Sequence, residues 1–207
     1  MDTIKLSMIM IVIVTSFIGF CVENIFSAYL SGVINNRNMI LPFLLGYGLA
    51  IIALYALFGT PDAPRFLHKE LLFNSSIWAN IYYFSVSFLC VCIGEITLGY
   101  MTQWCCGIIW WNYSKIPLHI TKYTSIPTSF GFATLITIFM KYCFDFLQLQ
   151  FTKMNPRVLA KASVFILTLL IIDFIHSGIY MFKKHDTLKI WTLRLPKPLK
   201  YYFNNKI

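Results

Sequence analysis

An all-α bundle of transmembrane helices is the fold class that the sequence predicts, and three observations lead to it. Only 12% of the 207 residues are charged, whereas soluble domains carry about 25% charged residues. Apolar residues make up 58% of the chain, and its mean hydropathy is +0.69. They gather in runs long enough for helical spans, and none of these runs alternates like a strand of a barrel. Because a helix satisfies its own backbone groups in lipid, a helical bundle follows.

About five runs reach the roughly 20 residues that a spanning helix needs. They cover residues 5–30, 41–59, 77–104, 125–150 and 158–182. We expect the first run to stay in the protein as a helix, because Asp2 dilutes the positive start of a signal peptide and the apolar stretch is longer than a signal peptide's core. We therefore predict two regions, a transmembrane helix bundle over residues 1–182 and a basic cytoplasmic tail over residues 183–207.

Two connections between these runs have distinctive compositions. Residues 60–76 contain Pro61 and Pro64, which predict a turn followed by a short interfacial helix. Residues 107–124 contain Trp110, Trp111 and Pro117, so they are too aromatic for a plain loop and too broken for a span. We predict that this aromatic loop lies in the membrane interface, or re-enters the bilayer where other helices shield its backbone.

The positive charge sets the predicted orientation. The net charge is +9, and the largest group of cations follows Phe182: Lys183, Lys184, Lys189, Arg194, Lys197, Lys200 and Lys206. Since Lys and Arg are enriched in cytoplasmic segments, we place the tail in the cytoplasm, the N-terminus outside, and the connections that hold Arg37, Lys115 and Lys122 inside. The chain is then a multi-pass protein of the cell membrane, with the lipid bilayer as its first partner. Nothing beyond the net charge suggests nucleic acid.

Two glutamates lie within predicted spans, where an ionisable group is costly. Glu95 precedes Gly99 by four residues, and Glu23 follows Gly19 by four residues. Glycines at such positions let another segment approach closely. Two residues are candidate partners of Glu23: Asn24 and Arg37. The glutamates mark either a functional polar site or structural contacts, such as a Glu–Arg pair or a protonated acid bonded to a neighbouring helix.

Other charged residues and motifs point away from enzymatic chemistry. Asp145 follows Lys141 by one helical turn and is expected to neutralise it. Asp173 and His176 share a face of the last span, which fits a structural role, a proton relay or half of a metal site. No C-x-x-C pair, P-loop, G-x-S-x-G or H-E-x-x-H motif is present. We therefore expect no cofactor and no metal, and an enzyme is not the favoured interpretation.

Three blocks of sequence carry a resemblance to a known family. They are residues 19–23, residues 36–48 with Arg37 and Pro42, and residues 94–117 with Glu95 and the sequence Trp-Asn-Tyr-Ser at 111–114. In these blocks the chain resembles the bacterial membrane proteins described as putative ABC-transporter type IV, or ABC transporter permease. The family has Asp where this chain has Asn112. Asn serves equally well if this position caps a turn, but a reactive acid would be lost.

The resemblance implies a permease-like transmembrane component that handles a small solute or lipid, together with a separate ATP-binding subunit or by self-association. It also favours one connected polar site within the membrane. The expected members of this site are Glu23, Asn24, Arg37, Glu95, Trp111, Asn112 and Tyr113. Two other functions stay open. One is an intramembrane enzyme that acts on a lipid substrate with two carboxyl groups as acid and base; the other is a non-catalytic membrane partner protein.

Overall fold

The computed structural model describes residues 2–198, which form two compact units. The terminal unit contains residues 2–49 and 155–198, and the central unit contains residues 50–154. The division falls within helix α2 (Leu45–Phe58). Tail residues 183–198 belong to the terminal unit, and residues 199–207, with Lys200 and Lys206, lie outside the described part of the chain. The expected boundary between bundle and tail at residue 182 stays a prediction.

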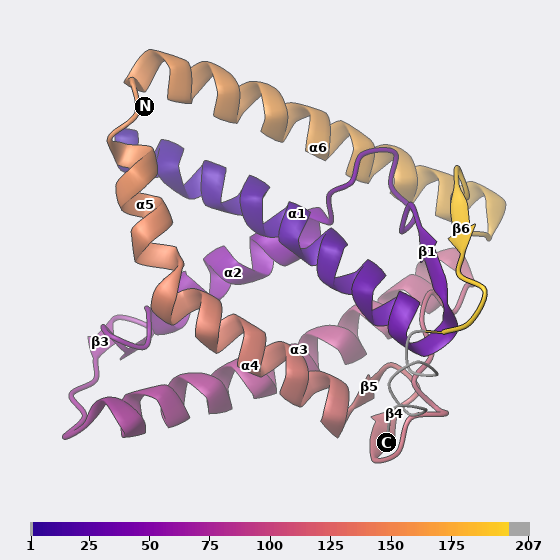
Figure 1. The fold of residues 1–207 in the computed structure, drawn as a ribbon, viewed down its shortest axis with the longest axis horizontal. Helices are drawn as coiled ribbons and strands as arrows, with labels where there is room; N and C mark the ends of the chain where they lie inside the picture. The colour runs from indigo at the N-terminus through magenta and orange to yellow at the C-terminus, as the bar shows by residue number, and fades with distance from the viewer. Residues whose placement is uncertain (1, 199–207) are drawn as a thin grey trace. The chain divides into compact units, whose positions relative to one another are not determined.

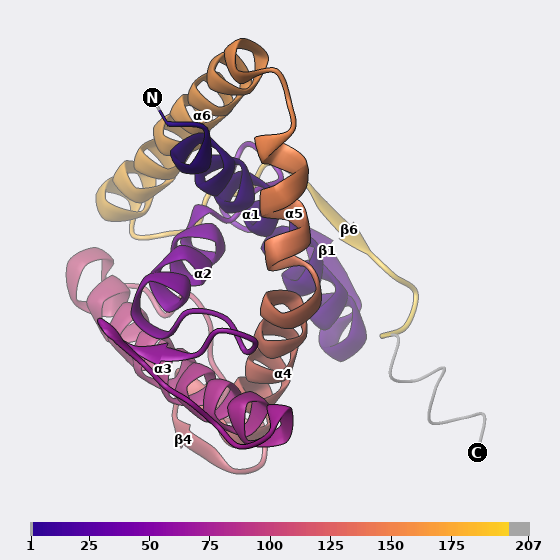
Figure 2. The same cartoon turned by 90° about the vertical axis from the view of Figure 1, so that its left-hand side faces the viewer.

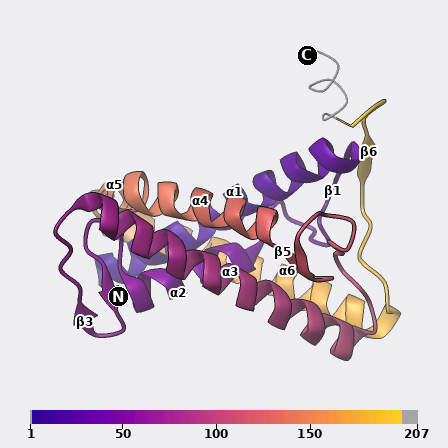
Figure 3. The same cartoon turned by 90° about the horizontal axis from the view of Figure 1, so that it is seen from below.

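Two long helices form the terminal unit, α1 (Thr3–Ser31) and α6 (Pro156–Lys184). The Asp2 side chain caps the start of α1, and Asn155 caps α6, where Pro156 occupies the first turn. The helices pack against each other and run in the same direction (Figures 1 and 3). Their last turns are closed by residues in the left-handed conformation, Gly32 after α1 and His185 after α6.

A small sheet joins the segments that follow these two helices. Strand β1 (Val33–Asn35) pairs antiparallel with β6 (Thr192–Arg194), with Val33 opposite Arg194. Nearer the N-terminus of α1, helix α2 approaches it closely at Gly48, where an added Cβ atom would lie 2.3 Å from the carbonyl oxygen of Val12. The terminal unit therefore holds its helices together both at their ends and along their length.

The central unit consists of α3 (Ser76–Cys106) packed against α4 (Ile126–Tyr142), which is followed by α5 (Phe144–Thr152). Helices α4 and α5 are separated by a break at Cys143 and bend by 43° (Figure 2). Because of this break, Lys141 and Asp145 do not share one continuous helix. The expected neutralisation of Lys141 by Asp145 is wrong for the described residues: Lys141 Nζ donates to Ser76 Oγ (3.2 Å) and Asn80 Oδ1 (3.0 Å) of α3 instead.

The two distinctive connections both form hairpins in the central unit. The expected interfacial helix after Pro61 is wrong, because β2 (Arg65–Phe66) and β3 (Lys69–Glu70) pair there. The turn between them places Leu67 at a φ of 55°, which a helix does not allow. In the aromatic loop, β4 (His119–Thr121) pairs with β5 (Thr124–Ser125), which leads directly into α4 (Figure 3).

The fold is all-helical apart from these short strands, as predicted, with six α-helices among residues 2–198. Three of them are long and apolar enough to cross a membrane, α1, α3 and α6, and the bent pair α4–α5 makes up to four. Helix α2 has 14 residues, and a helix of that length extends only about 21 Å, short of the roughly 30 Å hydrocarbon layer. The predicted number of about five spans is therefore not confirmed. Large apolar side chains on the long helices are exposed, such as Trp104 (87%) and Phe165 (66%), which suits contact with lipid.

Candidate functional site

In the terminal unit, Glu23 of α1 is bonded to the start of α2. Its carboxylate accepts a hydrogen bond from the Tyr47 hydroxyl. One turn earlier on α1, Gly19 leaves room for the same side chain, since an added Cβ atom would lie 2.4 Å from Cγ of Tyr47. The four-residue spacing puts Gly19 and Glu23 on one face of the helix. Gly19 accommodates the ring of Tyr47, and Glu23 binds its hydroxyl group.

Arg37 also reaches Glu23, but not in the predicted way. Its guanidinium Nη2 donates to the backbone carbonyl of Glu23 rather than to the carboxylate. Arg37 has a φ of 50°, and its backbone N–H is bonded to the Asn35 side chain at 2.9 Å. The other candidate partner, Asn24, does not bond to Glu23: its Oδ1 accepts from Asn35 N (2.9 Å), and its Nδ2 donates to the Phe20 carbonyl (3.2 Å). Asn24 therefore anchors the end of β1 to α1, and Arg37 anchors the loop that follows β1.

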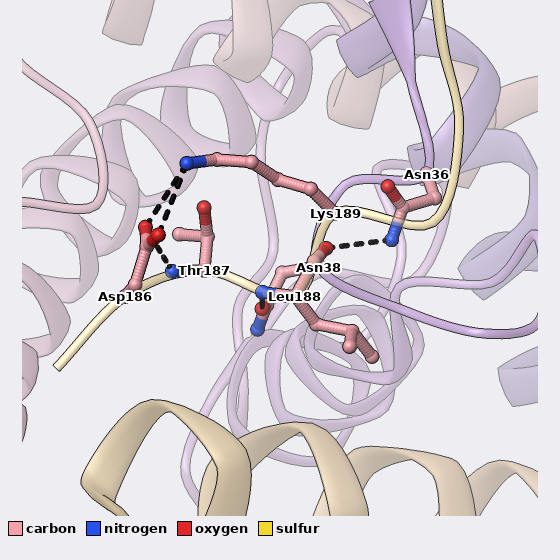
Figure 4. A network of polar contacts seen from close by, with 6 residues as sticks. All are labelled: Asn36, Asn38, Asp186, Thr187, Leu188 and Lys189. Atoms are coloured by element: carbon pink, nitrogen blue, oxygen red, sulfur yellow. Dashed lines mark hydrogen bonds and ion pairs between the residues drawn. The ribbon is translucent and has the colours of Figure 1, made fainter. Parts of the chain in front are cut away.

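The residues on either side of Arg37 bind the C-terminal segment (Figure 4). Asn36 Nδ2 donates to the Leu188 carbonyl at 2.8 Å, and Asn36 Oδ1 accepts from Ile190 N at 3.1 Å. Asn38 Oδ1 accepts from Leu188 N at 2.5 Å. Both asparagines are only 3% exposed. Since an amide side chain offers a donor and an acceptor like a peptide group, it can pair with an extended segment as a strand would. We call Asn36 and Asn38 the tail clamp.

Asp173 of α6 has a structural role in the same loop. Its carboxylate accepts from Ile40 N (2.9 Å) and Leu41 N (2.8 Å), and the residue is 5% exposed. Two backbone donors stabilise a buried carboxylate, so this acid is satisfied without His176. Within residues 2–198, no group of three or more His, Cys, Asp or Glu side chains is placed to hold a metal ion. The structure thus favours the structural interpretation of Asp173.

In the central unit, Glu95 of α3 is bonded to the start of α4. Its Oε2 accepts from Thr124 Oγ1 at 2.6 Å and from Ser129 Oγ at 3.1 Å, and these two hydroxyl oxygens are 2.9 Å apart. Thr124 and Ser129 are fully buried. Each hydroxyl hydrogen bond offsets part of the free energy that it costs to bury a carboxyl group within an apolar helix. This cluster joins α3, β5 and α4 at one place.

A tyrosine ring again covers a glycine beside the acid. An added Cβ atom on Gly99 would lie 2.2 Å from Cγ of Tyr123. The Tyr123 hydroxyl donates to Gln103 Oε1 at 2.8 Å, one turn farther along α3. Tyr123 is fully buried, so its ring fills the space that Gly99 leaves. Glu95, Gly99 and Gln103 follow one another at intervals of four residues and bind the hairpin along one side of α3.

The aromatic loop holds this hairpin in place. Trp111 Nε1 donates to the Tyr123 carbonyl at 2.8 Å, and Tyr113 N donates to the Lys122 carbonyl at 2.7 Å. Asn112 is exposed, and its Oδ1 accepts from Ser114 N at 2.8 Å, which is the bond of an Asx turn. Asn112 thus caps a turn, a role that either Asn or Asp performs.

The expected site residues therefore gather in two groups. Glu23, Asn24 and Arg37 lie together in the terminal unit, and Glu95, Trp111 and Tyr113 are linked through the hairpin in the central unit. The single connected site stays a prediction. Sequence reasoning missed the hydroxyl donors Tyr47, Thr124 and Ser129 and the tail clamp. The cluster of hydroxyl residues at 124–129, just before an apolar run, was the available signal for two of them.

Comparison with protein families adds one match to this geometry. The family described as putative ABC-transporter type IV matches residues 10–178, which include both glutamates and the residues that bind them, Tyr47, Thr124 and Ser129. The chain belongs to this family. Comparison with the curated proteins and with the solved structures gave no match. Family membership and the apolar helices together identify a membrane protein, and they agree with the resemblance carried by the blocks around Glu23, Arg37 and Glu95.

Proposed function

We propose that this chain is a permease-like transmembrane component that moves a small solute or lipid, with energy supplied by a separate ATP-binding subunit. Its family is described as an ABC-transporter type, and no P-loop is present in the sequence. A protein that uses ATP in this way then needs a partner that binds it. The proposal places the protein in the cell membrane with its C-terminal segment in the cytoplasm.

The observation that carries the proposal is the pair of carboxyl groups within apolar helices. Burying the carboxyl groups of Glu23 and Glu95 in a membrane costs free energy. Each is bonded to a later segment of the chain that folds back against the helix carrying the acid; we call it the returning segment. A returning segment bonded to an intramembrane acid is a suitable place for a transported group to compete for that acid. In the proposal, Glu23, Asn24 and Arg37 in one unit, and Glu95, Trp111, Asn112 and Tyr113 in the other, act in the same transport step.

The alternative of an intramembrane enzyme has less support. In this alternative, two carboxyl groups act on one substrate, one as the acid and the other as the base. Within its own unit, each carboxyl group has hydroxyl donors as hydrogen-bond partners: Tyr47 for Glu23, and Thr124 and Ser129 for Glu95. Hydroxyl groups of this kind hold a carboxyl group in place and do not exchange protons with it near neutral pH.

The proposal is tested by purifying the tagged protein from its native membranes in a mild detergent and quantifying what copurifies. A stoichiometric ATP-binding protein is the expected result. The complex is then reconstituted in nanodiscs, and ATP hydrolysis is measured with and without added lipid and small-molecule extracts of the native cells. Glu95→Gln should leave assembly intact and abolish the stimulation of ATP hydrolysis by these extracts. A clean preparation without an ATP-binding protein, obtained at several detergent concentrations, would remove the ABC-transporter interpretation. Full coupling in both Glu95→Gln and Glu23→Gln would remove the role of the acids.

A further inference from the structure

The segment that follows α6 is folded back onto the terminal unit. After Lys184 the chain leaves the helix at His185, whose φ is 51°. The tail clamp then binds Leu188 and Ile190 by their backbone groups, β6 pairs with β1, and Leu195 N donates to the Gly32 carbonyl at 2.8 Å. The segment is therefore fixed beside the C-terminal ends of α1 and α6, both of which are candidate membrane spans (Figure 1).

This fixed segment carries a strong excess of positive charge. Residues 183–198, which we call the basic segment, contain five cations and one acid, giving a net charge of +4 with His185 neutral (5 − 1). All five cations are exposed: Lys183, Lys184, Lys189, Arg194 and Lys197. The acid, Asp186, is bonded to Lys189 at 3.1 Å, and strand β1 beside the segment contributes no acid. The basic segment therefore carries a net excess of positive charge at the end of α6.

The backbone bonds leave the side chains of the basic segment free to face outward. Because the clamp and the β1–β6 pairing use peptide groups, the three residues of β6 all stay exposed. Ile190 is 52% exposed, Leu193 is 56% exposed, and Trp191 is 44% exposed beside Phe20 of α1. Apolar and indole side chains placed among cations at the end of a spanning helix are suited to the lipid–water interface.

We infer that the basic segment, held in place by the tail clamp, is a binding surface for anionic lipid headgroups. Phosphate-bearing headgroups are attracted to the net positive charge of the exposed cations, and the exposed Trp191 and Leu193 can enter the adjoining acyl region. The surface continues from the ends of two candidate spans, so a membrane reaches it without any further domain. A soluble acidic partner would match the charge but would leave the apolar side chains in water. The inference does not depend on the transport function.

The test uses the full-length protein in nanodiscs that contain phosphatidylcholine with about 30 mol% phosphatidylglycerol, whose negative headgroups attract basic segments. Spin-labelled forms of the two lipids report the relative association of each with the protein. The test variant is K189Q/R194Q/K197Q, which removes three exposed cations of the basic segment. The matched control is K69Q/K153Q/R157Q, which removes three exposed cations from outside the basic segment.

The wild-type protein and the control variant should prefer phosphatidylglycerol about threefold or more, and the preference should fall toward one in the test variant. It should also weaken in 0.5 M NaCl, because salt screens surface charge at about 4 Å. Helix content and elution volume check that all three proteins are folded. An unchanged preference in the test variant, or an equal loss in the control variant, would overturn the inference. The same holds for a wild-type protein without any preference.

Discussion

Each unit attaches a second segment to a long helix through a glycine and a glutamate four residues apart, and the order of these two residues is reversed between the units. In the terminal unit the glycine comes first, Gly19 and then Glu23, and one residue, Tyr47, provides both the ring over the glycine and the hydroxyl for the acid. In the central unit the acid comes first, and the tasks are divided: Tyr123 covers Gly99, while Thr124 and a second hydroxyl bind Glu95.

The glycine and the acid are common to both units, whereas the hydroxyl donors that bind the acid differ in number. A glycine and an acid four residues apart form one side of a helix, and a returning segment needs a ring and a hydroxyl to fit them. The terminal unit has a single hydroxyl donor on its acid and adds the tail clamp and the contacts of Arg37. The central unit has two buried donors instead. The central attachment should therefore depend more on the acid, and the terminal one on its loop.

The largest expected effect comes from the glycines under the rings. Gly99→Ala and Gly19→Ala each place a methyl group within the ring of a tyrosine, and overpacking of this kind costs about 1–3 kcal/mol of unfolding free energy. Gly94→Ala is the matched control on the same helix as Gly99, because its added Cβ atom meets nothing within 4 Å. Equilibrium unfolding in mixed detergent micelles measures the three variants. Equal stability of Gly94→Ala and Gly99→Ala would show that the ring does not require the glycine.

The next effect tests whether the acid matters more in the central unit. Thr124→Val removes a buried donor from Glu95 and should cost about 1–3 kcal/mol, since a buried group loses its partner. Tyr47→Phe removes the donor from Glu23 and should cost about 1 kcal/mol, because the ring stays over its glycine. Thr134→Val is the control, since the hydroxyl of Thr134 donates to the Phe130 carbonyl of its own helix. The comparison between units fails if Tyr47→Phe is the more harmful change.

The sequence predicted the helical class, because long apolar runs have few alternatives in lipid, and Glu23 and Glu95 lie in long helices where it placed them. It did not predict the partners of those acids. Arg37 was expected to pair with the Glu23 carboxylate but bonds to its carbonyl, because the left-handed turn at Arg37 directs the guanidinium to the backbone of α1. Such turns depend on contacts between segments far apart in the chain: Asn36 meets Leu188, and neither position marks the other in the sequence.

A smaller effect should follow from opening the tail clamp. In the variant N36A/N38A, the backbone groups of Leu188 and Ile190 lose their partners. Amide hydrogen exchange of residues 187–195 should then become at least tenfold faster, while exchange in α3 of the central unit stays the same. Asn74→Ala, an exposed asparagine of the central unit, is the control. Unchanged protection of residues 187–195 would mean that β1 alone holds the segment.

The smallest effect concerns Asp186, whose side chain is 59% exposed. Its hydrogen bond with Lys189 and then the Thr187 N–H lower the pKa of the Asp186 carboxyl group. A lowered pKa means that the folded segment is stabilised above the ordinary Asp pKa of about 3.9, and that this contribution is lost as the pH falls through the folded pKa. The protection of the amides of residues 187–190 against hydrogen exchange, corrected for intrinsic exchange, should decline slightly as the pH falls below about 3.9. Asp186→Asn should abolish this decline, and a decline of equal size in the variant would assign it to another group.

The most direct measurement of the central claim, that each acid fastens a returning segment to its own helix, is a pair of double-mutant cycles on unfolding free energy. Glu95→Ala with Thr124→Val, and Glu23→Ala with Tyr47→Phe, should each show a coupling of about 0.5–3 kcal/mol. Glu95→Ala with Thr134→Val should be additive within about 0.5 kcal/mol, since the Thr134 hydroxyl donates to the Phe130 carbonyl and not to Glu95. Additivity in all three cycles would contradict the claim and leave Glu23 and Glu95 without a structural role in holding these segments.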